Sequence, residues 1–331
     1  MQRTKRIWLI GLAAAVAVLA GAFAVLSREK PQDTLLPLCP YAAEEITALS
    51  YAGNGVEADF VKGSDEVWRL GSDPALPLQQ AMVESTVESY AVLNASRKLA
   101  GDELAELPAR SEAPLMTFSL TAGDTELSYT VDSLNNVTDT YYVYDASGNV
   151  YVVAKNDLVT LCKSPRKYYK AQTLTEYQTA DIAKMQVNDL AFVQTDGNWT
   201  LEDDAAAALD QSAVNKMAAT VLQAQTQWTI TAPEKDSAYG LDAPDVTAVL
   251  TFTDGTQLTV RFGDLVPDAA DDTDTGSTTT TSLCYLASDG APGIVYEVKA
   301  AHKDAFAVTK ESLLDTSTKE TAAADDVVAE H

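Results

Sequence analysis

The sequence is poor in the side chains from which most catalytic and metal sites are built. Its 331 residues include only two His and three Cys, which excludes His-rich metal sites and dense disulfide scaffolds. Basic residues are also scarce, with 23 Lys+Arg against 48 Asp+Glu and a formal net charge of −25. Such an acidic chain is a poor partner for nucleic acid or anionic lipid, because both are polyanions.

Common nucleotide-binding and nucleophile motifs are absent as well. The sequence has no phosphate-binding loop, no glycine-rich dinucleotide fingerprint and no G-x-S-x-G nucleophile elbow. It does have the composition of a folded protein, since 46% of its residues are hydrophobic and 21% are charged. At ~150 residues per domain, the length predicts about two domains.

One long apolar run lies near the N-terminus. Residues 8–26 carry no charge, and the flank at 1–7 is basic. A helix over this run is about 28 Å long, close to the ~30 Å hydrocarbon core of a bilayer. The run therefore predicts a transmembrane helix with a cytoplasmic N-terminal flank, which would make the chain a single-pass protein of the cell membrane with its bulk outside the cytoplasm. A cleaved signal peptide is the alternative, and acylation of Cys39 is a third.

The rest of the chain contains a weak internal repeat. Each half opens with an apolar strand and a hairpin that ends at Trp68 or Trp199, and a helix with one apolar stripe follows. Asp210 is the predicted N-cap of the second helix. Two hairpins with alternating apolar residues close each half. The pattern predicts an α+β fold with two similar modules, each an antiparallel sheet packed with one main helix and with its tryptophan in the core.

The predicted domain organisation follows from these patterns. It consists of the basic flank at 1–7, the transmembrane helix or signal peptide at 8–26, a linker at 27–43, modules at 44–162 and 181–314, a linker at 163–180 between them, and a disordered tail at 315–331. The tail is small, polar and charged, which is typical of disorder.

A short motif in the second half suggests a family. Its residues are Tyr239, Gly240, Leu241, Asp242 and Pro244, and a strand, a turn and a second strand ending at Phe262–Gly263 follow. Over residues 182–298 this order resembles the family known as domain of unknown function 4340. The first half has residues 107–114 in place of the motif and lacks the Tyr-Gly turn. We interpret the motif as structural, because turn chemistry accounts for each of its residues.

The resemblance implies a bacterial protein that is tethered by one N-terminal helix. It also implies a neighbourhood of gliding-motility-type ABC transporter components. The family supplies no catalytic residue that could be carried over to this chain.

Candidate sites for chemistry are few. His302 is the sole His within the predicted modules, and Asp304 would point elsewhere on a helix, so we predict no catalytic residue and no cofactor. An acidic insertion contains Asp268, Asp272 and Asp274, which are weak candidates for a calcium site; a flexible polar loop without metal is the preferred interpretation. Cys39 and Cys162 could join the ends of the first module in a disulfide, or stay reduced.

These observations predict a non-enzymatic, membrane-anchored accessory or interaction protein outside the cytoplasm, with an unidentified protein partner. The family resemblance implies that the partner belongs to an ABC transporter complex. One alternative is a module that binds cell-wall glycan or a small ligand through exposed aromatic residues such as Tyr168 and Tyr169. A second is a carboxylate-based hydrolase. A cleft lined by aromatic side chains would favour the first alternative, and a buried acid pair would favour the second.

Overall fold

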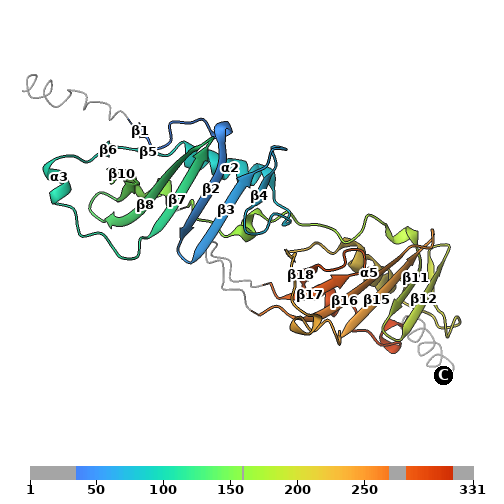
Figure 1. The fold of residues 1–331 in the computed structure, drawn as a ribbon. Helices are drawn as coiled ribbons and strands as arrows, with labels where there is room; N and C mark the ends of the chain where they lie inside the picture. The colour runs from blue at the N-terminus through green and yellow to red at the C-terminus, as the bar shows by residue number, and fades with distance from the viewer. Residues whose placement is uncertain (1–34, 159, 268–280, 316–331) are drawn as a thin grey trace, which may run out of the picture. The chain divides into compact units, whose positions relative to one another are not determined.

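The computed structural model describes residues 35–158, 160–267 and 281–315 (Figure 1). The first half forms an eight-stranded sheet with the order β4-β3-β2-β7-β8-β9-β10-β6. Its strands are β2 (Ile46–Gly53), β3 (Val56–Lys62), β4 (Trp68–Leu70), β6 (Arg97–Lys98), β7 (Met116–Ala122), β8 (Thr125–Asn135), β9 (Thr140–Asp145) and β10 (Val150–Ala154). A separate two-stranded sheet pairs β1 (Leu36–Pro37) with β5 (Asn94–Ala95).

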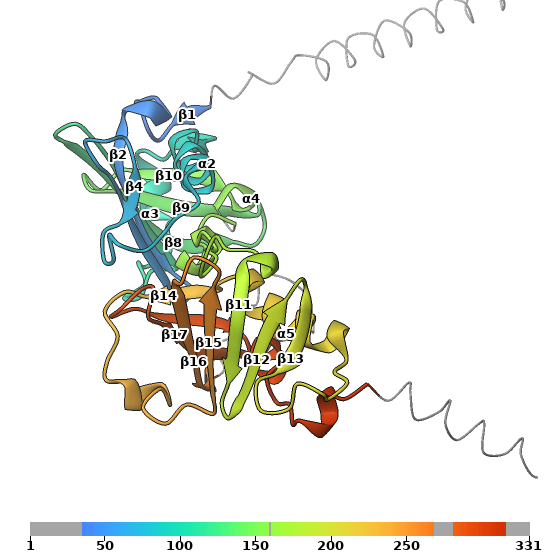
Figure 2. The ribbon, with the colours of Figure 1, turned by 90° about the vertical axis from the view of Figure 1, so that its right-hand side faces the viewer.

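The second half forms another eight-stranded sheet, with the order β13-β12-β11-β15-β16-β17-β18-β14. Its strands are β11 (Ile182–Val187), β12 (Leu190–Thr195), β13 (Asn198–Leu201), β14 (Trp228–Ile230), β15 (Val246–Phe252), β16 (Gln257–Leu265), β17 (Leu283–Ser288) and β18 (Val295–Lys299). Figures 1 and 2 show β11, β12, β15 and β16 as neighbours in this sheet. The described α-helices are α2 (Gln80–Ala91), α3 (Asp102–Ala105), α4 (Lys155–Leu158), α5 (Gln211–Gln223) and α6 (Ala300–Asp304).

The two sheets have the same architecture. When β2 is matched with β11 and β6 with β14, every strand of one order has its counterpart at the same place in the other. The register also shifts at the matching place, between Val131 and Ser133 in β8 and between Phe262 and Leu265 in β16. The identical order confirms the internal repeat, and we call the halves that carry the two sheets the first and second repeat.

The predicted α+β class is wrong, because the described fold is mostly β. Each sheet has eight strands, whereas only α2 and α5 among the described helices exceed five residues. Sequence patterns missed strands that are too short to alternate. Strands β6 and β14 have two and three residues, and each forms one edge of its sheet.

The predicted transmembrane helix is also corrected. The longest described helix, α5, has 13 residues, about 20 Å at 1.5 Å per residue and well short of a ~30 Å hydrocarbon core. No helix within 35–158, 160–267 or 281–315 is long and apolar enough to cross a membrane. The predicted span at 8–26 and its flank at 1–7 lie outside the described residues. The membrane anchor, the single-pass location in the cell membrane and the membrane as a partner are thus without support and are not carried further.

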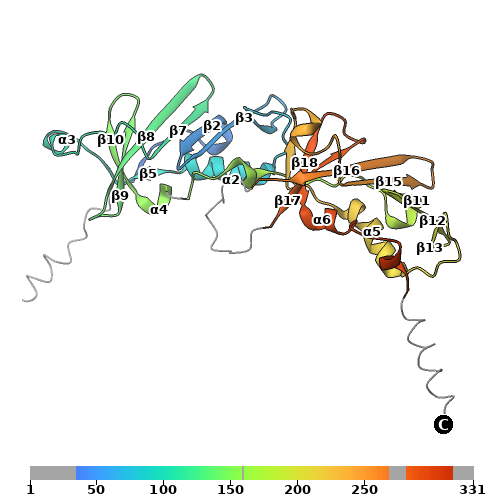
Figure 3. The same cartoon turned by 90° about the horizontal axis from the view of Figure 1, so that it is seen from below.

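The core of the second repeat lies between its sheet and α5. Val214, Met217 and Val221 follow the i, i+3, i+7 spacing and are at most 2% exposed, and they pack with alternate residues of β15. Figure 3 shows α5 and α6 on the same face of the sheet. Asp210 caps α5, because its carboxylate accepts from the backbone N–H of Ser212 at 2.9 Å, as the sequence predicted.

The first repeat is built in the same way. Val83, Val87 and Tyr90 of α2 are buried, and the Tyr90 ring lies 5.2 Å from that of Phe118 in β7. The two tryptophans are core residues, as predicted, with Trp68 and Trp199 only 3% and 1% exposed.

A glutamine clamp fixes each helix to an edge strand. In the first repeat, Gln80 Oε1 accepts from the backbone N–H of Trp68 at 2.8 Å, and Gln80 Nε2 donates to Trp68 O at 3.0 Å. In the second repeat, Gln211 makes the same two bonds with Trp199 at 2.7 and 2.9 Å. Both glutamines are the first residues of their helices. The clamp therefore holds a helix N-terminus to the edge strand that precedes it.

A closing segment ends each repeat. In the first repeat, Tyr168 O accepts from the backbone N–H of Gln79 at 2.7 Å, and Lys170 N donates to Pro77 O at 2.9 Å. In the second repeat, residues 313–315 bond to the chain before α5 in the same way: Leu313 O accepts from Asp210 N at 2.8 Å, and Asp315 N donates to Ala208 O at 2.9 Å. The predicted linker at 163–180 therefore begins with the closing segment of the first repeat.

The described chain divides into two compact units. The first unit holds Tyr51–Gly55, Val87–Cys162 and the described residues up to Ile46, and the second holds Thr47–Ser50, Val56–Thr86 and the described chain from Lys163 onward. The closing segment at 168–170 and the entrance to α2 that it contacts thus belong to one unit.

Candidate functional site

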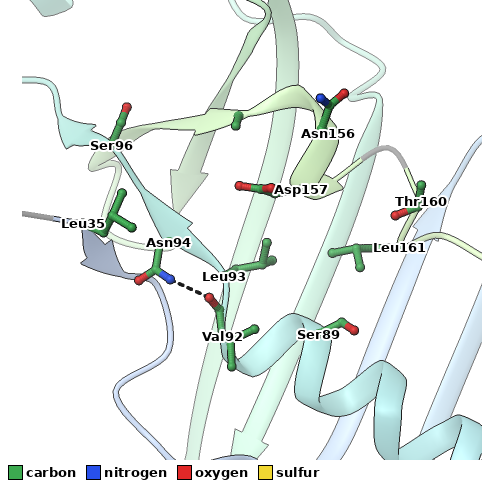
Figure 4. Close-up of a pocket in the computed structure, with 11 residues that line it drawn as sticks. Leu35, Ser89, Val92, Leu93, Asn94, Ser96, Asn156, Asp157, Thr160 and Leu161 are labelled. Atoms are coloured by element: carbon green, nitrogen blue, oxygen red, sulfur yellow. Dashed lines mark hydrogen bonds between the residues drawn. The ribbon is translucent and has the colours of Figure 1, made fainter. Parts of the chain in front are cut away.

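The first unit contains a cleft of about 470 Å³ beside the C-terminal end of α2 (Figure 4). Three segments line it: Leu35 before β1, residues 89–96 at the end of α2 and in β5, and residues 154–161 at the end of β10 and in and after α4. Pairing of Pro37 with Asn94 holds the first two segments together. The volume is within the ~300–1,000 Å³ range of small-ligand sites.

Polar side chains with unused hydrogen-bonding capacity gather on one wall of this cleft. Asn156, Asp157 and Thr160 line it, and none of them has a side-chain hydrogen bond to another described residue. In Figure 4 the Asp157 carboxylate points into the space between α4 and the chain that leaves α2. The lining includes no Lys, Arg or His. The negative charge of Asp157 is thus not compensated within the cleft.

The opposite wall is fixed by hydrogen bonds and has an apolar rim. Asn94 Nδ2 donates to Val92 O at 2.7 Å, drawn as a dashed line in Figure 4, and Ser96 Oγ donates to Val152 O at 3.1 Å. Val92 and Leu35 are 60% and 57% exposed. The cleft therefore combines an acidic polar wall with exposed aliphatic side chains at its mouth.

Each unit contains one buried acid among the residues that the structure describes. Glu297, 4% exposed in the second unit, accepts two hydrogen bonds from the Arg166 guanidinium at 2.7 and 2.9 Å. Asp132, 3% exposed in the first unit, accepts from the backbone N–H of Ser111 at 2.9 Å, and its other oxygen has no partner among the described residues. Glycoside hydrolysis needs two carboxyl groups that face one bond. Neither unit, within its described residues, holds two buried carboxyl groups that could act as such a pair.

The family motif closes the outer face of the second sheet. Gly240 has a φ of +68°, and the backbone N–H of Asp264 donates to Tyr239 O at 2.8 Å. A Cβ atom on Gly263 would lie 2.0 Å from Tyr239 O, so only glycine allows this approach. Leu241 is fully buried and packs in one cluster with Tyr239. These contacts place a turn over the register shift of β16.

The other two residues of the motif have smaller roles. Pro244 is half-buried just before β15. Asp242 is exposed and makes no side-chain hydrogen bond with the described chain. The carbonyl of Leu241 instead accepts from Arg261 Nη1 at 2.7 Å.

The remaining predicted residues are not brought together into a site. Cys39 Sγ donates to Tyr41 O and Cys162 Sγ donates to Gly53 O, so the structure keeps both as thiols and does not join them. Burial and nearby Lys299 lower the pKa of His302, which has no hydrogen-bond partner among the residues described. The calcium candidates Asp268, Asp272 and Asp274 lie outside the described residues.

The aromatic residues proposed for glycan binding are buried. Tyr168 is 0% and Tyr169 is 6% exposed. Tyr168 lies edge-on to the Phe60 ring, and the Tyr169 hydroxyl lies 2.6 Å from Thr226 Oγ1. Neither ring can serve as a surface platform for a sugar.

Comparison with known proteins gives one match. The family model for Domain of unknown function (DUF4340) matches residues 199–327. The match starts at Trp199 in β13, at the strand that the glutamine clamp of the second repeat holds. No curated protein and no solved structure matches the chain.

Proposed function

Because the family model that matches residues 199–327 is a domain of unknown function, we propose a function from the geometry of the chain. The protein is a non-enzymatic interaction protein that takes up a basic side chain of a partner protein in the cleft of the first unit. The observation that carries this proposal is the Asp157 carboxylate, which lines a cleft whose lining contains no Lys, Arg or His.

The two walls of the cleft match the two parts of a Lys or Arg side chain. Such a side chain has an apolar stem and a charged head. Leu35 and Val92 offer exposed aliphatic surface for the stem, and Asp157 with Asn156 and Thr160 offers oxygen acceptors for the head. Hydrogen bonds to a charged group contribute about 1.5–3 kcal/mol each.

The charge of the whole chain favours the same class of partner. A formal net charge of −25 attracts a basic surface over long range and raises its association rate at low salt. Binding should therefore weaken as ionic strength rises, because salt screens exposed charges beyond about 8–10 Å.

Peptide titration tests the proposal. The probes are two blocked pentapeptides, acetyl-Gly-Ala-Lys-Ala-Gly-amide and the same peptide with norleucine in place of lysine. We expect the lysine peptide to shift the backbone NMR signals of Asn156 and Asp157 in a saturable way. Asp157→Asn should weaken its binding at least tenfold, which corresponds to the loss of about 1.4 kcal/mol.

The matched control is Asp124→Asn in the exposed turn between β7 and β8 of the same unit. It changes the net charge by the same amount outside the cleft and should leave affinity within about twofold. The proposal is wrong if both variants weaken binding equally, if the norleucine peptide binds as well as the lysine peptide, or if neither peptide binds.

A further inference from the structure

The junction that forms the cleft of the first unit recurs in the second unit. In the first, Pro37 pairs antiparallel with Asn94, three residues after the end of α2. In the second, Thr173 pairs antiparallel with Gln225, two residues after the end of α5. A cleft of about 330 Å³ lies at this junction, and all its lining residues belong to the second unit.

The lining of this cleft differs chemically from the lining of the cleft in the first unit. The glutamine clamp matches Gln80 with Gln211, so Gln223 stands where the first repeat has the exposed Val92, and Gln225 stands where it has Asn94. Thr173 and Thr179 add hydroxyl groups. Within the described chain, these four side chains have no hydrogen-bond partner. The wall thus offers several amide and hydroxyl groups and no cation.

An aromatic ring is held rigidly in the same cleft. Tyr177 lines it and is half-buried. The Tyr177 ring stacks on Phe252 with centroids 3.8 Å apart and planes at 15°. Its hydroxyl donates to Asp254 Oδ2 at 2.7 Å, and that bond lowers the pKa of Asp254. The ring is therefore fixed before any ligand arrives, so binding costs little ordering of this side chain.

We propose that this cleft binds an uncharged saccharide. Amide side chains donate and accept at once, which suits adjacent sugar hydroxyls, and a fixed aromatic ring offers an apolar face for the C–H side of a sugar. Glu176 is the one charged residue of the lining and adds acceptor oxygens. The proposal shares no residue with the lysine site of the first unit, so either can fail without the other.

Titration of the full chain with neutral trisaccharides tests the proposal. The probes are N,N′,N″-triacetylchitotriose, maltotriose and cellotriose, each followed by the side-chain amide NMR signals of the glutamines. We expect at least one trisaccharide to shift the signals of Gln223 and Gln225 in a saturable way, with a dissociation constant near the millimolar range. The double variant Gln223→Ala/Gln225→Ala should weaken this binding at least tenfold, since it removes two hydrogen-bonding groups.

The control is Gln186→Ala/Gln257→Ala, which removes two exposed glutamine amides from β11 and β16 of the same unit outside the cleft. It should leave the affinity within about twofold. A second variant, Tyr177→Leu, should also weaken binding, because it removes the ring but keeps apolar bulk. The proposal is overturned if none of the three sugars binds at about 20 mM, or if the cleft variant and the control bind equally well.

Discussion

Replacing Gln211 by alanine should destabilise the protein by about 2–4 kcal/mol. The Gln211 amide accepts from Trp199 N at 2.7 Å and donates to Trp199 O at 2.9 Å. Trp199 is 1% exposed and lies in the edge strand β13, so its backbone groups on that side have little access to water. Each buried polar group left without a partner costs about 1–3 kcal/mol, and two such groups give the stated range when partial hydration at the edge is allowed for.

Urea unfolding followed by tryptophan fluorescence measures this loss. Gln80→Ala should cost a similar amount, because the first repeat makes the same bonds with Trp68 at 2.8 and 3.0 Å. Gln223→Ala is the control: it lies on α5, is exposed and has no hydrogen bond within the described chain, so it should change stability by less than about 0.5 kcal/mol. The reasoning is refuted if Gln211→Ala is no more destabilising than Gln223→Ala.

Two further predictions concern packing and pH. Gly263→Ala should destabilise the chain by about 2–3 kcal/mol in thermal unfolding, because its Cβ would lie 2.0 Å from Tyr239 O. The control Gly290→Ala should be nearly neutral, because its Cβ would meet nothing closer than 3.5 Å. Equal effects of the two variants would contradict this, since they would show that the turn over β16 shifts without cost. Burial raises the pKa of the Cys284 thiol from 9.0 to about 11, so its contribution to stability is complete below pH 9 and is lost as pH rises toward 11. The free energy of unfolding should therefore fall more steeply over this range in the parent than in Cys284→Ala, and parallel curves would contradict the assignment.

The repeat could be predicted from the sequence because both halves show the same spacing of apolar residues. The helices around Val83 and Val214 repeat their buried positions every three or four residues, and the long hairpins alternate. Trp68 and Trp199 mark the same place in both halves. Such signals depend only on residues close together in the chain, so one sequence is enough to find them.

Features that join distant segments were not predictable in this way. The cleft of the first unit brings together Leu35, Val92 and Asp157, and no local pattern connects them. The same holds for Tyr168, which sequence analysis treated as an exposed linker residue and which closes the first repeat against Gln79. The class was misjudged for a related reason, because strands such as β6 are defined only by their partner, here β10.

The family motif was predictable in part. Sequence alone explained Gly240 through turn chemistry, and the structure has the positive φ that this requires. The partner that makes Gly263 necessary, the carbonyl of Tyr239, lies 24 residues earlier in the chain. Turn residues can thus be recognised locally, whereas the surface on which a turn rests cannot.

The closing segments determine when each repeat can finish folding during synthesis. During synthesis the residues before α2 have no partner for Gln79 N and Pro77 O until Tyr168 and Lys170 have been added. The hydrogen bonds that close the first repeat can therefore form only after the ribosome has added nearly all of its residues. The closing bonds of the second repeat likewise require Asp315. Nascent chains halted before these positions should be sensitive to proteases at the helix entrances, since domains fold as units when their last element emerges.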